Sequence, residues 1–309
     1  MNKNILIYTH MPKFSFKDGG TVVQYNIARI LSNYKQNVKI YSSSGEKIPN
    51  SIFRNFYNND FPIDDNCVVI YCEGTPGNPL NAKNVVRWML SVLGQNVPYD
   101  YLNTWSKNEL VYHFNSEPRF ENEPEKIGTI YKLLSPLYLN PYMKQTNFQE
   151  RQGICFSVRK AFVTHKKKIY GCHPEGSFEI PAETSQMKYI EYFNKYKWFI
   201  SYDSNTFLTM MSAICGCISI VYKVDGLTKE EWLKTTAAAE YLKHNGLNNL
   251  YGIAYGREDM QYASDTVHLA KQQWDNIIEY CEEKTVLPFI EDLNNFENMQ
   301  NTIENNYNI

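Results

Sequence analysis

Two polar segments in the second half of this 309-residue chain combine residue types that can bind an anion. Arg159 and Lys160 follow an apolar run at 153–158. Two adjacent cations can neutralise a diphosphate, and the arginine fork can make a bidentate contact with it. The other segment lies directly before the apolar run 207–215 and consists of Tyr202, Asp203, Ser204, Asn205 and Thr206.

Residues 202–206 are predicted to form a loop in front of a helix. Ser204, Asn205 and Thr206 are favoured N-cap types, so a helix that begins there can direct its free backbone N–H groups at an anion. The apolar residues that follow recur at helical spacing, which gives the helix a buried face. We therefore expect this loop to lie at a ligand site together with the two cations.

A glycine pair, Gly19 and Gly20, lies near the N-terminus between a strand pattern at 4–8 and a helical pattern at 22–31. Glycine at a helix start lets backbone N–H groups approach a phosphate or a hydroxyl ligand. A plain turn is the alternative that stays open. The chain lacks GxGxxG here and has no GxxxxGK[ST], which disfavours an NAD dehydrogenase and excludes P-loop ATPase chemistry.

Composition and charge predict a soluble, cytoplasmic protein. The net charge of −2 gives no strong field for nucleic acid or an anionic membrane. The longest apolar region, 207–222, is interrupted and shorter than the roughly 20 residues of a membrane span. Seven scattered cysteines do not form a disulfide framework, and Cys215 with Cys217 lacks zinc spacing, so we expect no metal site.

The order of apolar patterns predicts two tandem α/β domains, each a Rossmann-like unit. The strands expected in the first half lie at 4–8, 37–41, 66–72 and 110–114, with helices at 22–31 and from about 82 to 93. Those of the second half lie at 153–158, 197–201, 217–222 and 250–255, with helices at 183–196, 207–215 and 263–283. Because the pattern degenerates over 133–150, the predicted domains are 1–148 and 149–309, with 294–309 as a weakly specified tail.

Ligands of open α/β sheets bind outside the carboxyl ends of the strands, which selects the residues just after each predicted strand. In the first domain, Glu73 follows the strand at 66–72 and begins a glycine- and proline-rich loop. His10 and His113 also stand at strand ends, but a structural histidine is the favoured interpretation of each.

These features together resemble the GT-B glycosyltransferases, in particular their retaining family 4-like group. A second-domain motif of that group has Glu, seven residues and Glu, and its two positions fall on Asp203 and Met211. Arg159 and Lys160 resemble the diphosphate clamp of the group, and Gly19-Gly20 resembles its glycine loop. The segment EGTPGNPLNAKNVVRW, from Glu73 to Trp88, resembles a set of short GT-B sequences.

The resemblance implies that two domains face a cleft, with a nucleotide-diphosphate sugar on the second domain and a glycan, lipid- or protein-linked sugar acceptor on the first. It implies that Asp203 holds the donor sugar, while Arg159, Lys160, Tyr202, Ser204, Asn205, Thr206, Gly19 and Gly20 bind the donor. Glu73 is the candidate general base of an inverting enzyme, or an acceptor ligand in a retaining one. The transfer needs no metal and no cofactor beyond the nucleotide-diphosphate sugar as co-substrate.

Two other functions stay open at the sequence level. Met211 cannot hydrogen-bond a ribose as a glutamate would, which makes a non-catalytic nucleotide- or glycan-binding module an alternative. A nucleotide-sugar epimerase on the same architecture is the other, although it needs more acid/base side chains than the strand ends provide. Fold analogy does not separate the three functions, because function depends on the site.

Overall fold

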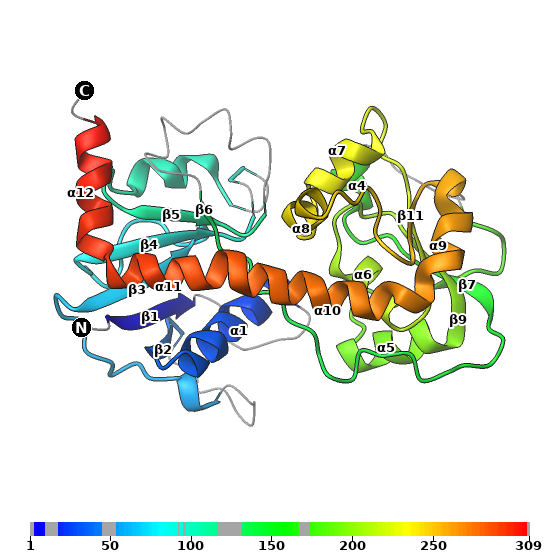
Figure 1. Ribbon diagram of the computed structural model, residues 1–309, viewed down its shortest axis with the longest axis horizontal. Coiled ribbons are helices and arrows are strands. Elements are labelled where there is room, and N and C mark those ends of the chain that lie inside the picture. The colour runs from blue at the N-terminus through cyan, green and yellow to red at the C-terminus, as the bar shows by residue number, and fades with distance from the viewer. Residues whose placement is uncertain are drawn as a thin grey trace. The chain divides into compact units, whose positions relative to one another are not determined.

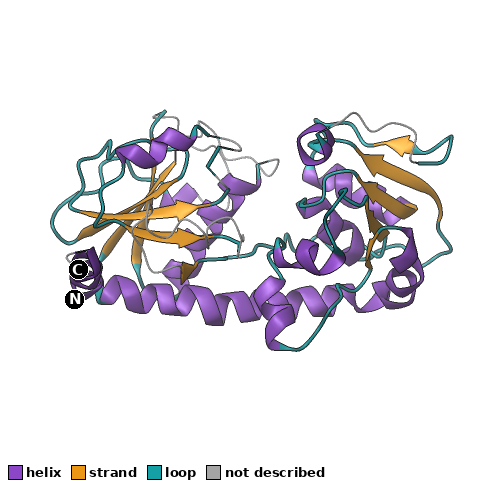
Figure 2. Ribbon diagram, turned by 90° about the horizontal axis from the view of Figure 1, so that it is seen from above, coloured by secondary structure: helices purple, strands orange, loops and turns teal. Residues whose placement is uncertain are grey.

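The structure is a computed structural model that describes residues 3–9, 18–44, 54–91, 93–94, 97–115, 132–166 and 173–307. The chain divides into two compact units (Figure 1). Unit 1 comprises 1–138 and 280–309, and unit 2 comprises 139–279. Each unit contains one sheet (Figure 2, orange) with helices packed beside it.

Unit 1 is built on a six-stranded parallel sheet in the order β2-β1-β3-β4-β5-β6. Its strands are β1 (Asn4–Thr9), β2 (Asn37–Ser42), β3 (Cys67–Cys72), β4 (Asn84–Met89), β5 (Leu110–His113) and β6 (Lys132–Leu133). Its helices are α1 (Gly19–Asn33), α11 (Leu287–Asn294) and α12 (Phe296–Tyr307), with 3₁₀ turns at Arg54–Phe56 and Tyr99–Thr104.

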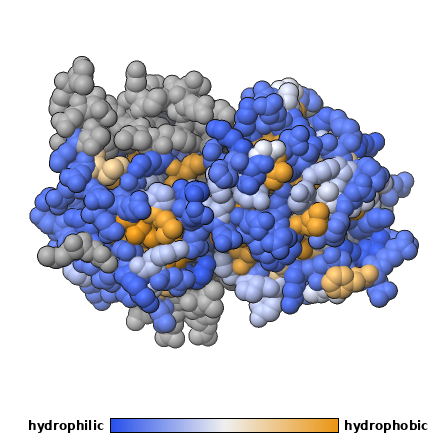
Figure 3. All heavy atoms as spheres, viewed as in Figure 1, coloured by the Kyte–Doolittle hydropathy of each residue, from blue (hydrophilic) through white to orange (hydrophobic). Residues whose placement is uncertain are grey.

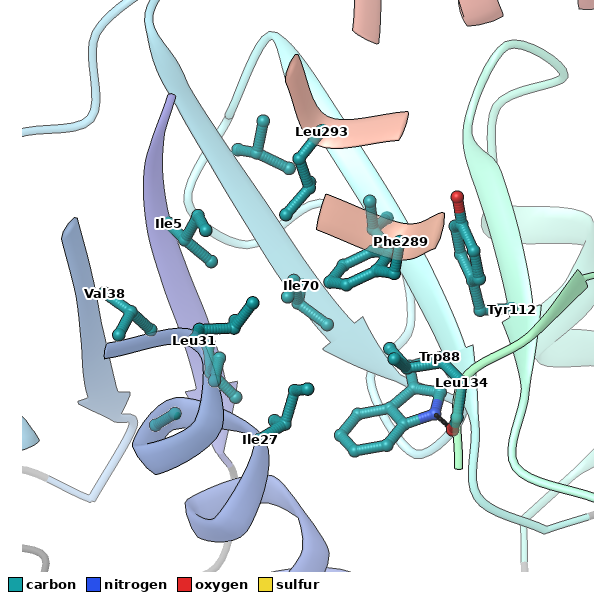
Figure 4. Close-up of a cluster of buried hydrophobic side chains, with 14 of the residues drawn as sticks. Ile5, Ile27, Leu31, Val38, Ile70, Trp88, Tyr112, Leu134, Phe289 and Leu293 are labelled. Atoms are coloured by element: carbon teal, nitrogen blue, oxygen red, sulfur yellow. Dashed lines mark hydrogen bonds between the residues drawn. The ribbon is translucent and has the colours of Figure 1, made fainter. Parts of the chain in front are cut away.

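The central strands of unit 1 are buried on both faces, which explains their continuous apolar sequences. Helices α1 and α11 contribute to the core on one face, where Ile27 and Leu31 join Phe289 and Leu293 around the sheet (Figure 4). The indole Nε1 of Trp88 donates to the Leu134 carbonyl oxygen at 2.9 Å within this core. The other face carries a second apolar cluster, made of Leu6, Phe61, Cys67, Val69, Tyr71, Ala82 and Val85.

The helix expected from about 82 to 93 is wrong, because residues 84–89 form strand β4. All six β4 residues are buried, so the segment shows no alternation that would mark it as a strand. Periodicity alone does not separate a fully buried strand from a buried helix, and Val85 and Val86 are the β-branched residues that favour the strand.

Unit 2 is built on a five-stranded parallel sheet in the order β11-β10-β9-β7-β8. Its strands are β7 (Gln152–Ser157), β8 (Phe178–Glu179), β9 (Tyr196–Ser201), β10 (Ile218–Val221) and β11 (Ile253–Tyr255). Its helices are α4 (Ala161–His165), α5 (Gln186–Lys195), α6 (Phe207–Ile214), α7 (Lys229–Lys234), α8 (Ala239–His244), α9 (Met260–Thr266) and α10 (Ala270–Cys281), with 3₁₀ turns at Arg257–Asp259 and Val267–Leu269. The predicted class of two tandem α/β units with parallel sheets is confirmed.

The C-terminal segment corrects the predicted domain boundary. After α10 the chain continues through a π-helical turn, Glu282–Val286, into α11, and residues from 280 onward belong to unit 1 rather than to a domain 149–309. Phe289, Leu293 and Phe296 are at most 1% exposed in the core of unit 1. Their spacing of four and three residues is helical, and Phe296 begins α12, which occupies Phe296–Tyr307 of the segment 294–309 predicted as a weakly specified tail.

A buried polar contact fixes α11 to the sheet of unit 1. Tyr112 on β5 donates its hydroxyl to the Asp292 carboxylate at 2.5 Å, and Lys132 on β6 places its ammonium 2.6 Å from the same carboxylate. Asp292 is buried, and a buried carboxylate needs partners of this kind. Burial of the Tyr112 phenol raises its pKa well above its usual range, and the hydrogen bond to the Asp292 carboxylate and the charge of that group add to the shift.

On the face drawn in Figure 3, the apolar patches of the described residues lie separately among hydrophilic residues. Within the described residues, no helix combines the length and the apolar character that crossing a membrane requires. The exposed large side chains include Phe148, at 78% exposure, and Phe162, at 65%.

The substitution Phe289→Ala tests whether the C-terminal helix completes the core of unit 1. Phe289 is fully buried, and removing its ring leaves a cavity, so we expect a loss of about 3–5 kcal/mol in unfolding free energy. Urea unfolding followed by circular dichroism measures the loss. The exposed Phe148→Ala should change stability by less than about 0.5 kcal/mol, and similar losses for the two variants would contradict the assignment.

Candidate functional site

The candidate residues of unit 2 lie at the switch point of its sheet. Strand β8 pairs with β7 on one side, whereas β9 pairs with β7 on the other side, so the direction in which successive strands are added to the sheet reverses between β7 and β9. Ser157 and Ser201, the last residues of these strands, are register partners. Open α/β sheets bind ligands just beyond such a point, which places the two segments after Ser157 and Ser201 together.

Arg159 and Lys160 are exposed immediately after β7. Arg159 has a φ of 31°, in the left-handed region that non-glycine residues rarely occupy. Ser157 lies two residues before it, is 2% exposed, and its Oγ has no hydrogen-bond partner in the part of the chain that the structure describes. A buried hydroxyl without a partner costs free energy, so a bound polar group beside it would be favourable.

Tyr202 is buried rather than presented at the surface. His173 Nδ1 lies 2.9 Å from its hydroxyl, and the His165 Nε2 atom lies 2.8 Å from its carbonyl oxygen. The His173 ring stacks on Phe156 with centroids 3.6 Å apart. The two imidazoles thus fix the side chain and the backbone of Tyr202, and its predicted contact with a donor stays a prediction.

The loop after Tyr202 is held by main-chain and side-chain contacts. Asp203 is 7% exposed, and its Oδ1 accepts the Asn205 backbone N–H at 3.3 Å. Trp232 on α7 donates its indole N–H to the Ser204 carbonyl oxygen at 2.7 Å. Asn205 donates its amide to the Thr235 carbonyl oxygen at 2.8 Å. These contacts give the Asp203 carboxylate a defined position.

Helix α6 begins at Phe207, as predicted, and Thr206 is its N-cap. The Thr206 Oγ1 accepts the Leu208 backbone N–H, which satisfies one of the free donors at this helix end. Met211 lies on this helix and is 2% exposed, so the residue at the expected second glutamate position is part of the core.

The start of α1 in unit 1 already holds a carboxylate. Asp18 caps the helix, with Oδ1 accepting the Gly20 backbone N–H at 2.9 Å and Oδ2 accepting the Thr21 hydroxyl at 2.7 Å. An anionic ligand at this position would meet the like charge of Asp18. Gly19 and Gly20 are the first two residues of α1 rather than a plain turn, and the Asp18 cap disfavours their predicted diphosphate contact.

Glu73 lies at the end of β3, as expected, and is 7% exposed. Its Oε2 accepts the Leu90 backbone N–H at 2.9 Å, and its Oε1 accepts the Ser91 hydroxyl at 2.6 Å. Burial raises the pKa of Glu73 above its ordinary value, although these hydrogen bonds act in the opposite direction. The raised pKa suits proton transfer. The hydrogen bonds from Leu90 and Ser91 also suit a purely structural role, in which Glu73 connects the ends of two strands.

A second buried group, the thiol of Cys72, adjoins Glu73. Burial raises the pKa of Cys72 well above its usual range, the charges of Glu73 and Asp18 add to this shift, and the hydrogen bond from Gln24 opposes it. Gln24 donates its amide to the Cys72 Sγ at 2.7 Å. The thiol is therefore protonated and inert at neutral pH.

His113 ends β5, and burial lowers its pKa to about 4. The imidazole is therefore neutral at pH 7, which agrees with a structural role. His10, the other histidine considered as a base, lies outside the described residues.

Sequence reasoning missed several residues that shape these sites. Asp18 is an N-cap type directly before Gly19, and that signal was present in the sequence. His165, His173 and Trp232 hold the loop at 202–206 from distant positions in the chain, and no local pattern marks such contacts.

The described cysteines are all buried and free, including Cys215 and Cys217. Among the described residues, no group of three or more His, Cys, Asp or Glu side chains is arranged to hold a metal ion.

Among the comparisons with known proteins, only the comparison with solved structures gives matches. No protein-family model matches the chain, and no curated protein matches it. A solved structure, the crystal structure of T4 phage BGT in complex with its UDP-glucose substrate, aligns with a TM-score of 0.49 and 10% sequence identity. The alignment covers 99% of this chain and 98% of the other. A similarity at this level identifies no substrate for the present chain.

The pH dependence of stability tests the buried state of His113. Its folded pKa of about 4 lies below the ordinary value of 6.5, so the unfolded chain takes up this proton first as pH falls. The contribution is complete above pH 6.5 and is lost between about 6.5 and 4, a change of about 3 kcal/mol.

We expect His113→Gln to be less sensitive than the wild type over this range, in urea unfolding from pH 7.5 to 4.5. His268, which is exposed, supplies the matched control His268→Gln. Parallel stability curves for wild type and His113→Gln would show that His113 is not held neutral in the folded state.

Proposed function

We propose that the chain is a GT-B-type glycosyltransferase that uses a nucleotide-diphosphate sugar. The observation that carries the proposal is the group of residues at the switch point between β7 and β9 in unit 2. There Ser157, with its buried hydroxyl, ends β7 beside Ser201 of β9, an exposed arginine–lysine pair follows β7, and the N-terminus of α6 follows β9. A diphosphate is the ligand that uses all of these groups at once.

Each part of the group has a role in the proposed transfer. The bond between the anomeric carbon and the diphosphate oxygen breaks, and a bond to an acceptor hydroxyl oxygen forms. Arg159, Lys160 and the start of α6 stabilise the leaving nucleoside diphosphate, so the charge of the phosphates is met by protein groups and no metal is needed. The buried Asp203 carboxylate accepts hydrogen bonds from the donor sugar hydroxyls.

The acceptor side of the proposal rests on Glu73. Its raised pKa and its position at the end of β3 support a role in accepting the acceptor proton or in binding the acceptor. The acceptor is a glycan or a lipid- or protein-linked sugar, and the nucleotide sugar is a co-substrate rather than a resident cofactor. The finer assignment to a family 4-like, retaining group rests on the sequence resemblance.

A second candidate function is binding of a nucleotide or glycan without turnover. Met211 favours it, because this thioether is buried in α6 and offers no hydrogen bond to a ribose. A weaker hold on the nucleotide is compatible with slow transfer or with none. Nucleotide release separates these two functions.

Incubation with a panel of UDP-, GDP-, dTDP- and CMP-sugars tests the proposal. We expect one donor to raise the melting temperature and to release free nucleotide. Arg159→Ala removes a bidentate charged contact and should weaken donor binding by about 10- to 100-fold. Asp203→Asn should lower the transfer rate by at least about tenfold, because a charged acceptor of hydrogen bonds is lost.

The matched control is Lys243→Ala, which removes an exposed cation at the end of α8 in the same unit. It should leave binding and release unchanged. A thermal response without release supports the binding module, and an isomerised sugar nucleotide without release supports an epimerase. No response to any member of the panel would overturn the proposed function.

A further inference from the structure

The most completely buried charge of unit 1, Arg87 on β4, contacts the loop that follows β3. Its side chain has no exposed surface. Its Nη1 donates to the Thr75 carbonyl oxygen at 2.9 Å, and its Nη2 donates to the Gly77 carbonyl oxygen. Both carbonyls belong to the loop that begins at Glu73, so a side chain from one strand fixes the backbone after its neighbour.

Glu109 supplies the counter-charge that makes this burial possible. The Arg87 Nε donates to its Oε2 at 2.6 Å, and the Nη2 donates to its Oε1 at 3.2 Å. Glu109 is itself 5% exposed. The guanidinium carbon also lies 5.0 Å from the ring centres of both Tyr71 and Trp105, where cation–π attraction adds to the pairing.

Glu73 makes the reciprocal contact. It begins the loop after β3 and accepts the Leu90 backbone N–H and the Ser91 hydroxyl, which directly follow β4. Arg87, on β4, thus holds the loop after β3. Glu73, the first residue of that loop, holds the segment after β4. The two strands are neighbours in the sheet, with Tyr71 and Arg87 as register partners.

The fork of arginine is essential to this arrangement. One guanidinium meets two loop carbonyls and both oxygens of a carboxylate, which a single ammonium cannot do in the same geometry. Without the fork, the Thr75 and Gly77 carbonyls lose the hydrogen bonds from Arg87, and the position of the loop over the sheet becomes less stable. Glu73 is the first residue of that loop and is 7% exposed.

We propose that Arg87, with Glu109 as its counter-charge, is a positioning residue that holds the loop from Glu73 to Gly77 and thereby the Glu73 carboxylate. Its expected effect on turnover rests on the proposed function, whereas its expected effect on the titration of Glu73 does not. The inference concerns the acceptor side, in unit 1, whereas the donor residues belong to unit 2. Arg87 touches no reacting atom and acts through Glu73.

Two variants test the inference. Arg87→Lys keeps the charge and removes the fork, and the double variant Arg87→Met/Glu109→Leu removes both charges and so keeps the interior neutral if the first variant does not fold. The Glu73 carboxyl is titrated by ¹³C NMR, and its resonance is assigned as the one that is missing in Glu73→Gln. We expect its pKa to fall towards the ordinary value in either variant, because the carboxylate becomes hydrated. Exchange of the Leu90 amide hydrogen should accelerate at least about tenfold.

The matched control is Tyr112→Phe, which removes a buried hydrogen bond elsewhere in unit 1. It should lower stability and leave the titration of Glu73 and the Leu90 exchange unchanged. An unchanged Glu73 titration in both Arg87 variants would overturn the inference. An equal change in Tyr112→Phe would also overturn it, since the effect would then follow from stability alone.

Turnover separates this inference from the proposed function. If the wild type transfers sugar, Arg87→Lys should lower kcat by up to about 100-fold with an unchanged KM for the sugar nucleotide, because only the acceptor side is displaced. A raised KM with an unchanged kcat would contradict the positioning role. A wild type that releases no nucleotide refutes the proposed function, and the NMR titration still decides whether Arg87 positions Glu73.

Discussion

Parallel strand pairing is the constraint on which both units of this chain depend. It brings the carboxyl ends of successive strands to one edge of each sheet, so that residues far apart in sequence become neighbours. In unit 2 the pairing of Ser157 with Ser201 places the segments after β7 and β9 side by side. In unit 1 the pairing of Tyr71 with Arg87 lets the ends of β3 and β4 hold each other. The register of strand pairing in each unit thus determines which side chains meet at the carboxyl ends of its strands.

The two sheet edges differ in the charged groups that they carry. The edge of unit 2 presents Arg159 and Lys160, which are exposed, and the start of α6 follows the neighbouring strand β9, a combination that suits a diphosphate. The edge of unit 1 is rich in hydrogen-bond acceptors, because Asp18 caps α1 and the Glu73 carboxylate is buried beside Cys72. Such an edge suits hydroxyl groups better than phosphates. This division agrees with a donor that binds to unit 2 and an acceptor that binds to unit 1.

The strand ends were the part of this structure that the sequence predicted well. The buried strands, the loop at 202–206 and the start of α6 are local patterns, and the structure places them as expected. The failures have physical causes. Strand β4 is buried on both faces and therefore shows no alternation. The apolar residues that return the C-terminal segment to unit 1, Phe289, Leu293 and Phe296, are few and lie beyond the last predicted helix, which ended at 283. Contacts such as Arg87 with Thr75 depend on tertiary packing, which no local pattern reveals.

In the proposed function, a nucleoside diphosphate binds at the switch point between β7 and β9. Chemical-shift mapping of backbone amides during titration with uridine and guanosine diphosphates tests it most directly. The largest shifts should occur at Arg159, at Lys160 and over 202–208, and they should be lost in Arg159→Ala. Largest shifts at the start of α1, or saturable shifts that persist in Arg159→Ala, would contradict the claim.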